Sequence, residues 1–115
     1  MSRRILVVDD DRAMVRTLCD IFRLRGWDAR GAYSGEEALA LQDELRCPVV
    51  LMDVKMCGID GVAAGLAMKA AAPELRVILM TAMDSGEGRP ASEPDHGLRI
   101  LPKPVDIAGL LALLD

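Results

Sequence analysis

Acidic side chains stand at the ends of two apolar stretches of this 115-residue sequence. The run ILVV is followed directly by Asp9, Asp10 and Asp11, and the run PVVLM is followed by Asp53. Neighbouring carboxylates repel one another, so a fold that brings them together needs a cation among them. Hard oxygen ligands without His or Cys beside them favour Mg²⁺ or Mn²⁺. The pattern therefore predicts a divalent metal site.

A hydroxyl and an ammonium group follow two further apolar stretches. Thr81 ends the run LRVILMT, and Lys103 follows LRIL within the motif LPKP. A carboxylate with a divalent cation, a hydroxyl and an ammonium group around it offers what the oxygens of a phosphoryl group need. In this interpretation Asp53 is the nucleophile toward phosphorus, and Thr81 and Lys103 each hold one phosphoryl oxygen. The spacing thus indicates phosphoryl chemistry.

The elements that must position these groups are short apolar runs that alternate with segments of helical period. This alternation is typical of βα units around a parallel sheet. We predict strands at 4–9, 28–32, 48–53, 75–81 and 98–101. The carboxyl ends of the strands in such a sheet form the crevice where ligands bind. All the candidate groups are therefore expected at one edge of the sheet.

Helices are expected between these strands. In the first, Met14, Leu18, Ile21 and Phe22 recur at helical spacing, and Gly26 provides a stop. Asp11 is interpreted as the N-terminal cap of this helix rather than as a metal ligand.

Two more helices have recognisable starts. Ser34 and Glu37 form a capping box, and Asp60 caps a helix that Pro73 ends. A short final helix is expected within residues 106–115.

The segment 83–97 breaks this rhythm. It carries Gly86, Gly88, Pro90, Pro94 and Gly97 and almost no apolar residue. Each Gly costs a helix interior about 1 kcal/mol and each Pro about 3 kcal/mol. We therefore expect the fourth helix to be degenerate or missing and to be replaced by a loop.

Composition limits the class of protein. With 51% hydrophobic residues, the chain can bury one good core, so residues 1–115 are expected to form one domain. No apolar run is long enough to span a membrane, and we expect a cytoplasmic protein. The net charge is -4 and the arginines are scattered, which argues against direct binding of nucleic acid. Cys19, Cys47 and Cys57 lack metal-site spacing and are interpreted as buried or half-buried thiols.

Four motifs together resemble a known family. ILVVDDD, LMDVKMCGIDG, ILMTA and LPKP, in this order, are similar to those of the receiver domain of two-component response regulators. The resemblance spans nearly the whole chain. It implies an α/β fold, a flavodoxin-like three-layer sandwich with a five-stranded parallel sheet of order 2-1-3-4-5.

The resemblance also assigns roles around the acidic cluster. It implies that Asp53 accepts a phosphoryl group from a histidine kinase or a phosphotransfer protein. It implies a Mg²⁺ or Mn²⁺ cofactor held by four residues, with Asp9 acting largely through water: Asp9, Asp10, Asp53 and the backbone carbonyl of Lys55.

The remaining implied roles concern phosphoryl binding and signalling. Thr81, Ala82 and Lys103 would hold the phosphoryl group, and the domain would then bind a downstream effector protein or domain. Such a domain is a phosphoacceptor and not an enzyme, apart from self-phosphorylation by small donors and self-dephosphorylation. The family commonly has Tyr or Phe at the switch position occupied here by Ile100, so this aromatic is absent.

Two alternatives remain open. A degenerate receiver would act only as a protein-binding module without being phosphorylated. A haloacid-dehalogenase-like phosphatase would use Asp9 as nucleophile and Asp11 as general acid and base. Ala13 stands where that family has Thr or Val, and the chain is short for its core and cap.

Overall fold

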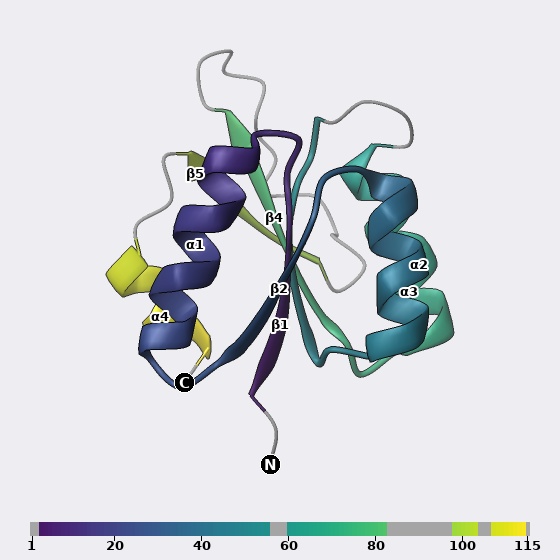
Figure 1. Cartoon of the computed structure of the whole chain (residues 1–115). Helices are drawn as coiled ribbons and strands as arrows, with labels where there is room; N and C mark the ends of the chain where they lie inside the picture. The colour runs from purple at the N-terminus through teal and green to yellow at the C-terminus, as the bar shows by residue number, and fades with distance from the viewer. Residues whose placement is uncertain (1–2, 56–59, 83–97, 104–106, 115) are drawn as a thin grey trace.

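The computed structural model describes residues 3–55, 60–82, 98–103 and 107–114. Five parallel strands form one sheet in the order β2-β1-β3-β4-β5. The strands are β1 Arg4–Val8, β2 Asp28–Ala32, β3 Val49–Asp53, β4 Arg76–Ala82 and β5 Leu98–Lys103. The helices within the described residues are α1 Arg12–Leu24, α2 Gly35–Leu45, α3 Gly61–Ala71 and the short α4 Ile107–Leu114. Figure 1 shows α1 and α4 on one face of the sheet and α2 and α3 on the other.

The sheet separates two hydrophobic cores, because successive side chains of a strand point to opposite faces. Ile5 and Val7 of β1 belong to the core under α1 and α4, where Phe22 is the largest helical side chain. Leu6 and Val8 belong to the core under α2 and α3. These four residues of β1 are fully buried, as a sheet covered on both faces requires.

The predicted helix starts are confirmed by hydrogen bonds. The side chain of Asp11 accepts a bond from the Met14 N–H (3.1 Å), and that of Asp60 accepts one from the Ala63 N–H (2.9 Å). Ser34 Oγ accepts from the Glu37 N–H (3.0 Å). The returning bond of this capping box reaches one residue further back than expected, since Glu37 Oε1 accepts from the Tyr33 N–H (2.8 Å).

The predicted sheet order and α/β fold are confirmed. Element ends differ by a residue or two: Asp9 lies just beyond β1, and β5 continues to Lys103, which therefore belongs to the strand instead of following it. Gly26, predicted to stop α1, follows the C-cap with a φ of +89°, which favours glycine. The expected loss of the fourth helix concerns residues 83–97, which lie outside the described residues. None of the described helices combines the length and apolar character that crossing a membrane requires.

Cys19 and Cys47 are buried free thiols, as predicted. Cys57 lies outside the described residues. Burial raises the pKa of the Cys19 thiol above 9.0, although the nearby Arg23 partly offsets this rise. Burial likewise raises the pKa of the Cys47 thiol above 9.0, partly offset by Arg4. A raised pKa in the folded state means that the unfolded thiol ionises first as the pH rises. The stability contributed by each neutral thiol is therefore complete below pH 9.0 and is lost as the pH rises through the folded pKa.

We predict that the Cys47→Ala variant loses less stability than the wild type between about pH 8 and about pH 10.5, because it lacks one such thiol. Urea unfolding at each pH measures the free energy of unfolding of both proteins. The two proteins differ only at residue 47, so the difference between their slopes of unfolding free energy against pH isolates the thiol. If the free energy of unfolding fell equally with pH in both proteins, burial of Cys47 would not favour its neutral form.

Candidate phosphoryl and metal site

Two buried carboxylates lie at the carboxyl edge of the sheet. Asp9 follows β1 directly and Asp53 is the last residue of β3, and their exposed fractions are 1% and 7%. Strand alternation continues from Val7 to Asp9 and from Leu51 to Asp53, so both side chains emerge on the side of α1 and α4. Among the residues whose burial the structure describes, Asp9 and Asp53 are the only buried charged side chains.

A third carboxylate completes the cluster. One carboxylate oxygen from each of Asp9, Asp10 and Asp53 can be chosen such that all three lie within 4.8 Å of one another. Asp10 is exposed, which leaves the cluster open to solvent on one side. Asp9 Oδ1 accepts a hydrogen bond from the Asp11 N–H (3.0 Å), which fixes this carboxylate. The donor set consists of anionic oxygens alone and fits a hard divalent cation such as Mg²⁺.

Backbone contacts hold the residue that follows Asp53. Asp53 pairs with Met80 of β4, and the Val54 N–H donates to the Met80 carbonyl (2.9 Å). The Gly61 N–H at the start of α3 donates to the Val54 carbonyl (2.8 Å). A Cβ at Gly61 would overlap the backbone carbonyl oxygen of Asp53, so glycine is required here for close approach. The start of α3 thus fixes the end of β3.

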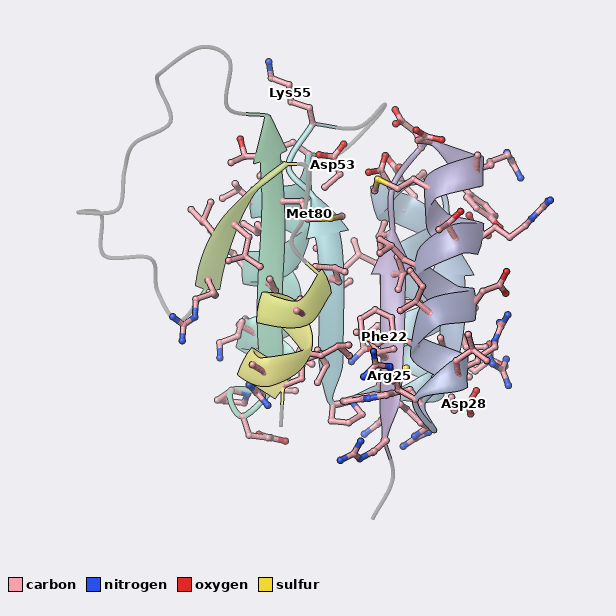
Figure 2. All side chains as sticks on the ribbon, turned by 90° about the vertical axis from the view of Figure 1, so that its left-hand side faces the viewer. Phe22, Arg25, Asp28, Asp53, Lys55 and Met80 are labelled. Atoms are coloured by element: carbon pink, nitrogen blue, oxygen red, sulfur yellow. The ribbon has the colours of Figure 1, made fainter. Side chains whose placement is uncertain are left out.

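The other predicted site residues lie at the same edge of the sheet. Lys55 is exposed two residues after Asp53, and Figure 2 shows its side chain directed away from the Asp53 carboxylate. Thr81 is half-buried one residue beyond Met80. The backbones of Ala82 and Lys103 pair at the ends of β4 and β5. Ile100, at the switch position, is 43% exposed on β5.

Sequence reasoning missed two features near the cluster. The Arg12 guanidinium lies over the Tyr33 ring, 4.2 Å from its centroid, and nothing in the spacing of these residues predicts this stacking. The role of Gly61 was also missed. Its signal was visible in the motif LMDVKMCGIDG, where a glycine follows the cap residue Asp60.

Comparison with known proteins assigns the chain to a family. The family model for the response regulator receiver domain matches residues 5–115. The chain belongs to this family, whose members are regulatory phosphoacceptors of two-component systems.

Individual relatives agree with the family assignment. The chain is 35% identical over 112 residues to the response regulator MprA of Mycobacterium bovis, a match that covers 97% of this chain and 49% of MprA. The chain therefore spans about half the length of this curated relative. It superposes on the receiver domain of the Francisella response regulator 1452 with a TM-score of 0.85 at 27% identity, covering 98% of this chain and 93% of that one.

A third relative was solved in complex with Mg²⁺-BeF. The response regulator TrrA from Thermotoga maritima, in complex with Mg²⁺-BeF, matches with a TM-score of 0.84 at 25% identity. The match covers 99% of this chain and 96% of TrrA.

We predict that Gly61→Ala destabilises the protein by about 2–3 kcal/mol, because the added methyl group must displace backbone. The neighbouring Val62→Ala is the control: Val62 is 38% exposed, and its truncation is expected to cost less than about 1 kcal/mol. Urea unfolding followed by circular dichroism measures both. An unchanged free energy of unfolding in Gly61→Ala would mean that the close approach to Asp53 is not a constraint.

Proposed function

We propose that Asp53 accepts a phosphoryl group from the phosphohistidine of a histidine kinase or phosphotransfer protein, in a Mg²⁺-dependent reaction. The observation that carries this proposal is the convergence of three carboxylates within 4.8 Å, two of them buried. Such a cluster is costly unless a cation joins it. Bound Mg²⁺ (or Mn²⁺) would neutralise the charge that otherwise prevents an anionic donor from approaching an anionic nucleophile.

The nucleophile in this proposal is an Asp53 carboxylate oxygen. It forms the new oxygen–phosphorus bond while the phosphorus–nitrogen bond of the donor breaks, and the leaving imidazole keeps the bonding electron pair. Asp9, Asp10, Asp53 and the Lys55 backbone carbonyl would hold the metal, which would supply the positive charge. The bond from the Asp11 N–H to Asp9 and the bond from Gly61 to the loop keep these groups in place before the donor arrives.

The phosphoryl oxygens would be held by groups from the next two strands. In this proposal the Thr81 hydroxyl and the Ala82 N–H bind two of them, and the Lys103 ammonium pairs with a third. These residues end neighbouring strands, β4 and β5, which supports a shared role. Residues 1–115 would form one receiver domain that changes its protein interactions on phosphorylation. Ile100 cannot act as an aromatic switch, so the change would reach other proteins by another route.

The phosphatase alternative is not favoured by the geometry around Asp11. Its side chain accepts a hydrogen bond from the Met14 N–H and caps α1. Asp9, the nucleophile of that alternative, is 1% exposed. The second alternative, a binding module that is never phosphorylated, is tested by the experiment below.

We predict that acetyl phosphate and Mg²⁺ together phosphorylate the protein on Asp53. The Asp53→Asn variant should take up no phosphoryl group, and chelation of the metal with EDTA should abolish uptake by the wild type. Asp43→Asn removes an exposed carboxylate on α2 and is the matched control that should be phosphorylated normally.

Borohydride trapping and peptide mass spectrometry locate the modified residue. Label on Asp9 would replace this proposal with the phosphatase alternative. Absence of label from both acetyl phosphate and a phosphohistidine donor would support the unphosphorylated binding module instead.

A further inference from the structure

The outward face of α3 is apolar along its whole length. Val62 and Leu66 are each 38% exposed, and the other exposed residues of the helix are alanines: Ala63, Ala67, Ala70 and Ala71. The single charged residue of the helix is Lys69, which is half-buried and donates through Nζ to the carbonyls of Pro73 (3.0 Å) and Leu75 (2.7 Å). A helix that is apolar on all sides is normally covered on all sides.

A groove runs beside this face, between α2 and α3, which Figure 1 shows next to each other on one side of the sheet. Its volume is about 420 Å³. Apolar groups make up most of its wall, and the residues that do so include Leu39, Cys47, Ala67, Met68 and Leu75. The groove and the α3 face together form one apolar surface, because Ala67 and Ala71 belong to both.

Exposed acidic side chains lie on the elements that form this surface. Six exposed carboxylates lie along α2, at the cap of α3 and in the turn after it: Glu36, Glu37, Asp43, Glu44, Asp60 and Glu74. Asp43 and Glu74 line the groove itself, and Arg46 is its one basic lining residue. The opposite helix, α1, differs in charge, since its exposed residues include Arg12, Arg16 and Arg23. Asp43 and Glu74 thus form an acidic rim of the groove, and their negative charge exceeds the positive charge of Arg46.

We propose that this groove binds an amphipathic helix of a partner protein, with an apolar stripe on one face and Lys and Arg beside it. The apolar stripe would cover α3 and enter the groove, while the basic residues would pair with the acidic rim. The eleven residues of α3 span about 16 Å, which matches a partner helix of about three turns. The site is separate from the acidic cluster and does not depend on phosphorylation.

A second copy of the chain fits this surface less well. A symmetric dimer through α3 would bring the same acidic rims together, since a two-fold interface uses one patch on both subunits. The exposed face of α1 carries the complementary charge, but its arginines offer no apolar stripe to fill the groove. Charge complementarity therefore favours a basic amphipathic helix.

A pair of synthetic peptides tests the proposal. The first is a fluorescein-labelled helix of about 14 residues with Leu and Ala on one face and Lys on the other; the second has Glu in place of every Lys. Fluorescence anisotropy with the full chain should show the Lys peptide binding at least about tenfold more tightly than the Glu peptide. Asp43→Lys should reduce this difference in affinity, because it should weaken binding of the Lys peptide and strengthen binding of the Glu peptide.

The control separates the groove from general charge attraction. Ala67→Arg places a charge in the groove and should weaken the Lys peptide at least about tenfold. Leu24→Arg makes the same change in net charge at a residue of α1 that is 85% exposed, and should alter affinity less than about twofold. Circular dichroism checks that both variants are folded, and Ala71→Arg replaces Ala67→Arg if the latter is not.

Three results would overturn the proposal. The first is that neither peptide binds. The second is that the two arginine variants weaken binding equally, which would make the attraction non-specific. The third is that sedimentation equilibrium shows a dimer of the wild type that Ala67→Arg dissociates, which would make a second copy the occupant.

Discussion

Repulsion among the carboxylates of Asp9, Asp10 and Asp53 is the interaction on which the account of this domain depends. A fold gains nothing by itself from holding three acids within 4.8 Å of one another with two of them buried. Once a divalent cation supplies opposite charge, the three carboxylates stabilise the fold, because burial then strengthens their attraction to the cation. In the proposed function, the same negative charge that disfavours the metal-free protein would attract a small hard cation, and the bound cation would then allow an anionic donor to approach.

The rest of the fold holds these acids in place despite their repulsion. Parallel pairing of β3 with β1 and β4 sets Asp53 beside the end of β1, and burial on both faces fixes this register. The caps at Asp11 and Asp60 start α1 and α3 where the loops of the site must end. Gly61 then allows the start of α3 to rest against the backbone of Asp53. The packing energy of the two cores, which reach the residues next to Asp9 and Asp53, opposes the local repulsion.

The sequence predicted much of this arrangement because the signals are local. Uninterrupted apolar runs indicate strands that are buried on both faces of the sheet. Asp11, Ser34 and Asp60 indicate helix starts, because each side chain accepts a hydrogen bond from a backbone N–H only three residues later. The convergence of Asp9, Asp10 and Asp53 could also be predicted from the sequence, since the carboxyl ends of parallel strands lie at one edge of the sheet. The stacking of Arg12 on Tyr33 and the acid-rimmed groove between α2 and α3 could not be predicted, because both depend on how separate elements pack side by side.

These carboxylates are expected to destabilise the metal-free protein and to stabilise the metal-bound one. Urea unfolding of the wild type and of Asp10→Asn, each with EDTA and with saturating Mg²⁺, tests this expectation directly. We expect the effect of the substitution to change sign: Asp10→Asn is more stable than the wild type in EDTA and less stable than the wild type in Mg²⁺. A variant that is less stable in both conditions, or equal gains from Mg²⁺ in both proteins, would contradict it.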